Sequence, residues 1–124
     1  MRKIEFRGIN VATDKMMYGD LRVHSLSCGS EIIEIVERID GFCEISEVNP
    51  DTVGQFTGIK DKDGKEIFEG DILKGQYDLL LYKEKFQQQV RWFPLQAKFN
   101  VGQSKIIYKI IGNIHENPKL LEKK

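Results

Sequence analysis

Acidic residues and glycines crowd the segment TGIKDKDGKEIFEGDIL, residues 57–73, where carboxylates could hold a cation. An EF-hand calcium loop needs oxygen ligands at positions 1, 3 and 5, glycine at 6 and a bidentate Glu at 12. Counting from Asp61 as position 1 puts Gly64 at 4, Lys65 at 5 and Ile72 at 12, so the register fails. A hairpin turn with Asp63 and Gly64 at its φ > 0 positions accounts for the same residues. The segment therefore predicts a turn, and no metal is expected there.

The sequence also matches neither a phosphate-binding loop nor a typical zinc site well. The string GQFTGIKDKDGK contains neither GxxxxGK[ST] nor GxGxxG, and its lysines lie among acids that repel phosphate. A zinc site could draw on four strong ligands, and only the first two of them are close in sequence: His24, Cys28, Cys43 and His115. Without a second close pair, we expect two free, buried thiols and no cofactor.

Nucleophilic catalysis would require a Ser or Cys beside a His and an orienting acid. Two histidines leave every arrangement open and indicate none, and SCGS at residues 27–30 is not GxSxG. Acids such as Glu69 and Asp71 are more typical of strand ties and caps than of catalysis. We therefore expect no enzymatic activity.

The chain is neutral overall, but its last third is basic. Residues 1–50 carry six Lys/Arg and nine Asp/Glu, residues 51–82 carry four and seven, and residues 83–124 carry nine and three. Cations alternate there with rings, which could turn lysines toward phosphates and rings toward bases. Alternation equally predicts rings in the core and lysines on a solvated face, and the neutral total favours this second interpretation. The candidate nucleic-acid-binding residues are Lys83, Lys85, Arg91, Trp92, Lys98, Lys105 and Lys109.

Short strands must position these residues. Residues 3–6 and 15–24 are β-prone pieces around the turn-like NVATDK, and FQQQVRWF, QAKFNV and KIIYKII are later strand candidates. For residues 30–48 two templates compete: Ser30 and the spacing of apolar residues fit a helix, whereas β-branched residues around Asp40–Gly41 fit a hairpin. We choose the hairpin. Many short strands with glycine turns predict an antiparallel barrel or sandwich, and we choose a small barrel.

The two ends of the chain and its length set further limits. At 124 residues the chain is expected to form one domain, as a monomer or small oligomer. Asn117 is a plausible N-cap with Pro118 at the first helical position, which predicts a short C-terminal helical turn. No apolar run approaches the roughly 18 residues that span a bilayer, and no signal-peptide h-region follows the start. We therefore expect a cytoplasmic protein with no membrane partner.

Residues 52–73, TVGQFTGIKDKDGKEIFEGDIL, resemble the signature of the YopX family, small proteins encoded mainly by prophages and bacteriophages. The resemblance extends to IEFRG at 4–8, YGDL at 18–21 and IIGNIHENPKLL at 110–121. Departures are mild: Phe56 and Phe68 stand where the family often has Tyr, and His115 where an aromatic residue is common.

The YopX resemblance implies a fold more than a function. It implies an SH3-like β-barrel core at residues 51–124, an N-terminal extension of hairpins at 1–50, and no established activity, cofactor or catalytic residue. Gly70 would form a sharp corner between strands, where Asp71 accepts backbone N–H groups. The signature residues, expected to have structural roles, are Thr57, Gly58, Asp61, Asp63, Gly64, Glu69, Gly70, Asp71, Gly112, Asn113, Asn117 and Pro118.

Together these observations predict a non-enzymatic accessory protein of a mobile genetic element. The leading hypothesis is that the protein is a protein-binding or self-associating module with an unknown protein partner. One alternative is a nucleic-acid-binding module that uses the basic third of the chain. The other is an enzyme whose site the sequence does not reveal.

Overall fold

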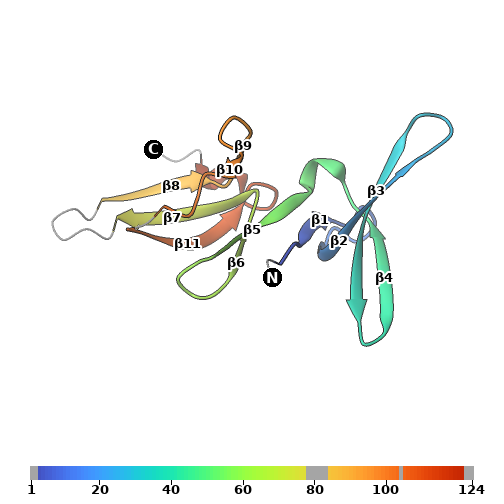
Figure 1. Ribbon diagram of the computed structural model, residues 1–124, viewed down its shortest axis with the longest axis horizontal. Coiled ribbons are helices and arrows are strands. Elements are labelled where there is room, and N and C mark those ends of the chain that lie inside the picture. Colours follow the sequence, from blue (N-terminus) through green and yellow to red (C-terminus); the bar gives the residue numbers. More distant parts are fainter. Residues whose placement is uncertain (1–2, 78–83, 104, 122–124) are drawn as a thin grey trace. The chain divides into compact units, whose positions relative to one another are not determined.

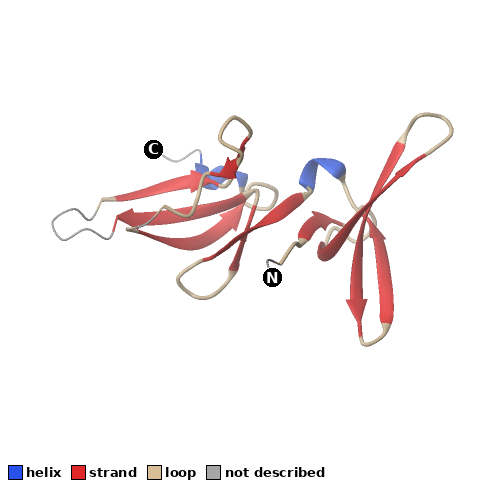
Figure 2. Ribbon diagram, in the orientation of Figure 1, coloured by secondary structure: helices blue, strands red, loops and turns tan. Residues whose placement is uncertain are grey.

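The computed structural model describes residues 3–77, 84–103 and 105–121, which are built mainly of strands (Figure 1). Within these ranges, helix is confined to two short 3-10 turns, shown in blue in Figure 2. The chain divides into two compact units, Met1–Phe56 (unit 1) and Thr57–Lys124 (unit 2). The boundary expected from the sequence, between residues 50 and 51, lies a few residues earlier.

Unit 1 is an antiparallel sheet in which successive strands are neighbours. Its strands are β1 (Phe6–Ile9), β2 (Met16–Ser25), β3 (Glu31–Ile39) and β4 (Phe42–Glu47), in the order β4-β3-β2-β1. A 3-10 turn, η1 (Pro50–Thr52), then leads to β5 (Gly54–Lys60), whose first residues pair with β1. Ile35 and Val48 form the most buried part of this unit, with 0% and 1% of their surface exposed.

Residues 30–48 form the predicted hairpin and not the competing helix. Strands β3 and β4 pair antiparallel from Glu34↔Glu47 to Ile39↔Phe42. Asp40 and Gly41 connect them with φ values of 47° and 84°, the two left-handed residues that a type I′ turn requires. The β-branched side chains therefore decided the local structure, as their stiffness in a helix suggests.

Unit 2 contains the rest of β5 and two small sheets. Its other elements are β6 (Glu66–Phe68), β7 (Asp71–Tyr77), β8 (Lys85–Gln89), β9 (Trp92–Phe93), β10 (Lys98–Phe99), β11 (Ile106–Asn113) and η2 (Pro118–Leu121). One sheet has the order β11-β7-β8, and β9 pairs with β10 in a separate hairpin. The core consists of Ile67, Leu73, Val90 and Tyr108.

The mainly-β prediction is confirmed, but the SH3-like barrel is not, because the described strands form open sheets. Alternation and turn spacing predict where strands lie and which side of each is buried. They do not specify whether the first and last strands of a sheet meet, which is what closes a barrel. The C-terminal element, η2, is a single 3-10 turn. No helix within the described ranges is long and apolar enough to cross a membrane.

Candidate functional site

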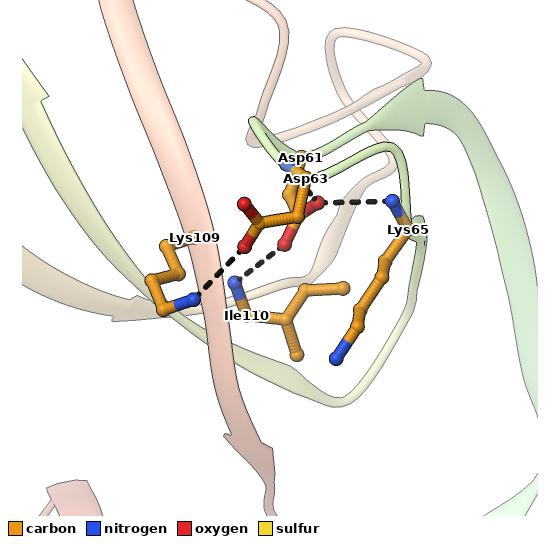
Figure 3. A network of polar contacts seen from close by, with 5 residues as sticks. All are labelled: Asp61, Asp63, Lys65, Lys109 and Ile110. Carbon is orange, nitrogen blue, oxygen red and sulfur yellow. Dashed lines mark hydrogen bonds and ion pairs between the residues drawn. The ribbon is translucent and has the colours of Figure 1, made fainter.

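The signature turn between β5 and β6 is organised by the carboxylate of Asp61. One oxygen, Oδ1, accepts the backbone N–H groups of Asp63 at 2.9 Å and Lys65 at 3.0 Å (Figure 3). The other, Oδ2, accepts the N–H of Ile110 on β11 at 3.1 Å. A single side chain thus shapes the turn and ties it to a strand distant in sequence.

Burial and hydrogen bonding act on Asp61 in opposite directions. Burial to 7% exposure would by itself raise the pKa of this carboxyl. The three backbone N–H donors, with a smaller contribution from the charge of Lys109, outweigh burial and lower the pKa below its ordinary value. Folding therefore stabilises the ionised form of the Asp61 carboxyl group.

The prediction that both Asp63 and Gly64 have φ > 0 is wrong for Asp63. Gly64 has φ of 84°, whereas Asp63 is not among the described non-glycine residues with positive φ. A three-residue loop built as a type I turn followed by one left-handed glycine needs only that glycine. The Asp63 carboxylate instead lies 2.9 Å from Nζ of Lys109. A metal ion in this turn would need the carboxylates of Asp61 and Asp63. The Asp61 carboxylate instead accepts backbone N–H groups, and the Asp63 carboxylate pairs with the ammonium group of Lys109.

Other signature residues also satisfy backbone groups. Asp71, 2% exposed, accepts the N–H of Phe68 at 2.8 Å beside the Gly70 corner, where φ is 91°. Thr57 donates its hydroxyl to the carbonyl of Ile67 at 2.9 Å. These contacts hold β5, β6 and β7 in register.

The loop after β11 is built around Asn113. Its Oδ1 accepts the N–H groups of His115 at 3.0 Å and Glu116 at 2.9 Å. Asn117 Oδ1 accepts the N–H of Asn113 at 3.3 Å and approaches Gly112 so closely that a Cβ there would lie 2.6 Å away. Asn117 thus stabilises the loop that precedes it, and Pro118 begins η2.

Two signature positions remain. Gly58 has φ of 89°, and Glu69 precedes the Gly70 corner.

The sheet β11-β7-β8 carries lysines on the side opposite the core. Leu73 on β7 is buried, and the next residue, Lys74, is exposed and lies directly opposite Lys109 on β11. Gln76 lies opposite Lys85 on β8. A hollow of about 160 Å³ is lined by Lys62, Lys74, Gln76, Lys85, Ile107, Tyr108 and Lys109. We call Lys62, Lys74, Lys85 and Lys109 the lysine face.

The lysine face is positively charged because its cations are mostly uncompensated. Asp63 pairs with Lys109, and the resulting hydrogen bond and attraction raise the pKa of that lysine. Within the described part of the chain, Lys62, Lys74 and Lys85 form no side-chain ion pair or hydrogen bond. Like charges directly opposite each other in a sheet are destabilising, so the Lys74–Lys109 pair is not explained by folding.

The predicted nucleic-acid-binding residues lie in several different parts of unit 2. Lys85 and Lys109 belong to the lysine face. Arg91, Trp92 and Lys98 lie on or next to the β9–β10 hairpin, and Lys105 precedes β11. Lys83 lies outside the described residues.

Lys62 and Lys74 of the lysine face were missed from the sequence. Both lie in the acid-rich segment 51–82, where the charge count pointed away from an anion site. The alternation in DILKGQY, residues 71–77, is the signal that could have placed Lys74 on an exposed face.

The candidate zinc ligands do not converge. No group of three or more His, Cys, Asp or Glu side chains in the described ranges is arranged to hold a metal ion. His24 Nε2 lies 2.8 Å from Glu34 Oε1. Cys28 and Cys43 are free but exposed, so the expectation of buried thiols is wrong. Cys28 lies in the turn between β2 and β3 and Cys43 on β4, where neither side chain has a core to enter.

The fold and these sites define a small mainly-β protein whose polar signature residues hold turns and whose open sheet presents lysines. The chain matches the YopX family, described as YopX protein, over residues 5–122 and belongs to that family. It is similar to the crystal structure of protein EF1440 from Enterococcus faecalis, with a TM-score of 0.55 and 27% identity. That similarity covers 98% of this chain and 99% of the other. No curated protein matches the sequence.

Proposed function

We propose that this YopX-family chain is a non-enzymatic accessory protein of a phage or prophage that binds the phosphates of a nucleic acid. The lysine face carries the proposal. Four lysines line one hollow on an open sheet, and only Lys109 has a described acidic partner. Lysine clusters of this kind bind phosphate backbones largely through electrostatics and counterion release.

A binding role is supported over catalysis by how the polar side chains of the turns and loops are used. Asp61, Asp71 and Asn113 direct their side-chain oxygens at backbone N–H groups of their own turns and loops. A general acid or base would need to face a site where a substrate can reach it. The hollow on the sheet is lined by lysines, and such a lining recognises anions without providing an acid–base pair.

The lysine face contacts phosphates rather than bases in this proposal. Phe86 packs against the core cluster, and Tyr108 belongs to that cluster and is only 5% exposed, although it also lines the hollow. Base stacking on this face is therefore not available from them. The contacts that remain are charge contacts, which position a nucleic acid without reading its sequence.

The test is the salt dependence of binding to a fluorescent DNA oligonucleotide. We expect binding at low salt that weakens as salt rises, with a log–log slope of about −0.9 per phosphate contacted on duplex DNA. The variant K74Q/K85Q should weaken binding and reduce the slope by almost 2 by the same relation. The control K15Q/K119Q removes two lysines that do not line the hollow and should change neither. Absence of binding by the wild-type protein at low salt would overturn the proposal.

A second candidate, a protein-binding or self-associating module, is favoured by apolar residues on unit 1. Phe42 and Ile39 face each other across the β3–β4 turn and are 77% and 46% exposed. Exposed apolar side chains of this size often belong to an interface. If unit 1 self-associates, the mass measured by light scattering should rise with concentration and fall in F42S. A constant monomer mass would reject self-association.

Two finer features complete the proposal. A cytoplasmic location would give the protein access to phage nucleic acid. An SH3-like relationship of unit 2 is supported by the family resemblance and by its short antiparallel strands with a glycine corner at Gly70.

A further inference from the structure

The β9–β10 hairpin presents apolar side chains to solvent, although it belongs to the basic unit 2. Trp92 is 45% exposed, Phe93 39% and Leu95 at the tip 96%. Arg91 and Lys98 flank these residues and are also exposed. We call residues 91–99 the aromatic finger.

The base of the aromatic finger is held firmly by Asn100. Its Oδ1 accepts the N–H of Arg91 at 2.8 Å, and its Nδ2 donates to the carbonyl of Gln89 at 2.8 Å. The Asn100 N–H donates to the carbonyl of Arg91 at 3.0 Å, and its carbonyl accepts from Gln88 Nε2 at 2.9 Å. Asn100 therefore ties the hairpin to β8, so its exposed rings project from a fixed support.

The ring of Trp92 is oriented before any partner arrives. It meets Phe99 at a centroid distance of 4.9 Å and an interplanar angle of 70°, a common edge-to-face geometry. Almost half of the Trp92 surface nevertheless remains open. An oriented, half-open indole loses little conformational entropy when a flat ligand stacks on it.

Two observations select the partner. Exposed rings alone would suit an apolar protein pocket, but Arg91 and Lys98 have no acidic partner within the described ranges. Rings interleaved with unpaired cations match the stacking and charge contacts that proteins make with unpaired nucleic-acid strands. In a duplex the base faces are covered by neighbouring pairs, so the rings would gain nothing there.

We infer that the aromatic finger stacks on unpaired bases, which makes single-stranded nucleic acid the preferred ligand of this protein. The inference rests on the proposed function, because the lysine face supplies the phosphate contacts. It adds that Trp92 discriminates between single strands and duplexes.

Intrinsic fluorescence gives a direct test, because Trp92 is the single tryptophan of the chain. An oligothymidine strand should quench this emission, and a duplex of the same length at the same salt should quench it less. W92A should weaken single-strand binding by roughly tenfold, within the range for loss of one stacked base, and leave duplex binding unchanged. W92F should retain most of the affinity. The control V11A removes part of an apolar side chain that is 56% exposed in unit 1 and should have no effect.

The possible outcomes separate the two proposals. Equal single-strand and duplex affinities with W92A neutral would overturn the role of the aromatic finger while leaving phosphate binding intact. Quenching by polyglutamate but not by oligothymidine would overturn it in favour of an acidic protein partner. If neither nucleic acid binds at low salt, the proposed function fails, and this inference fails with it.

Discussion

At the scale of single residues, one carboxylate does more for the structure than its position in a loop suggests. Asp61 accepts three backbone N–H groups and links the β5–β6 turn to β11. Asp63, two residues later, is exposed and reaches Lys109 instead. The two acids of this short motif therefore have different roles. Asp61 stabilises the fold, and Asp63 reduces the positive charge of the lysine face.

Replacing Asp61 with Asn should destabilise unit 2 at neutral pH. The amide can keep one acceptor oxygen but turns an N–H donor toward another backbone N–H, and charged hydrogen bonds are lost. We expect a fall of about 1.5–3 kcal/mol in the free energy of unfolding, measured by urea denaturation. D51N, a matched change at an exposed carboxylate, should have almost no effect.

The effect of D61N should also depend on pH. Because the folded-state pKa of Asp61 is lowered, its contribution is fully present above the unfolded value of about 3.9 and is lost as pH falls through the folded value. The stability gap between wild type and D61N should therefore narrow below pH of about 4. A gap that widened in acid would contradict this account of the turn.

Replacing Asp63 with Asn should strengthen nucleic-acid binding. The change frees Lys109 from its carboxylate partner at 2.9 Å and removes a negative charge from the edge of the lysine face. One more lysine then contacts phosphate, so the log–log salt slope should steepen by up to about 0.9 for duplex DNA. Fluorescence anisotropy titrations at several salt concentrations measure this slope. Unchanged or weaker binding would show that phosphates do not compete with Asp63.

At the scale of elements, strand contacts explain sequence features that have no chemical role. Gly19 in YGDL lies on β2, where a Cβ would sit 2.2 Å from the carbonyl oxygen of Val36 on β3. That oxygen belongs to the backbone and cannot move aside like a flexible side chain. Gly19 is therefore needed because β2 and β3 approach each other closely at this position.

The variant G19A should accordingly disrupt unit 1. Displacing β2 from β3 is expected to cost roughly 1–3 kcal/mol or more, as overpacking of a filled core does. Denaturant unfolding monitored by circular dichroism checks this, with S25A as an exposed control on the same strand. If G19A were as stable as S25A, the close approach would not hold in solution.

Strand pairing also predicts a conflict between stability and binding at Lys74. This residue lies directly opposite Lys109, and removing one of two facing like charges should stabilise a sheet by roughly 0.2–1 kcal/mol. K74Q should therefore raise the unfolding free energy while weakening nucleic-acid affinity. Loss of both stability and affinity would indicate that Lys74 acts through the fold and not through the ligand.

At the scale of the whole molecule, zero net charge conceals two oppositely charged units. Unit 1 carries six Lys/Arg and ten Asp/Glu, and unit 2 carries thirteen and nine, giving −4 and +4. Average charge is therefore a poor guide to what this chain binds. Local fields over one face decide which ligands approach it.

Nucleic-acid binding should consequently persist above the isoelectric point of about 6.7. At pH 8 the molecule as a whole is slightly negative, whereas the lysine face keeps its local excess of lysines over acids. If the local field of the lysine face governs binding, affinities measured at pH 6 and pH 8 at constant ionic strength should agree within about twofold. A fall of about tenfold would indicate adsorption governed by net charge.

Local patterns in the sequence predicted several of the strands and turns. The β3–β4 hairpin, the Gly64 turn and the alternation of β11 follow from β-branched residues, glycines and period-two patterning, which act over a few neighbours. Family membership was also evident, because its motifs are contiguous strings. Asp63 was assigned the wrong backbone conformation because the same residues fit two turn types that differ by one left-handed position.

Tertiary structure alone decided how distant segments meet. It left the sheets open where a barrel was expected, and it brought Lys62 and Lys74 from an acidic segment to Lys85 and Lys109 from a basic one. It also directed Asp61 at Ile110. Side-chain alternation is a short-range property and is written in the chain, whereas strand pairing over tens of residues depends on the balance of all contacts and chain entropy at once.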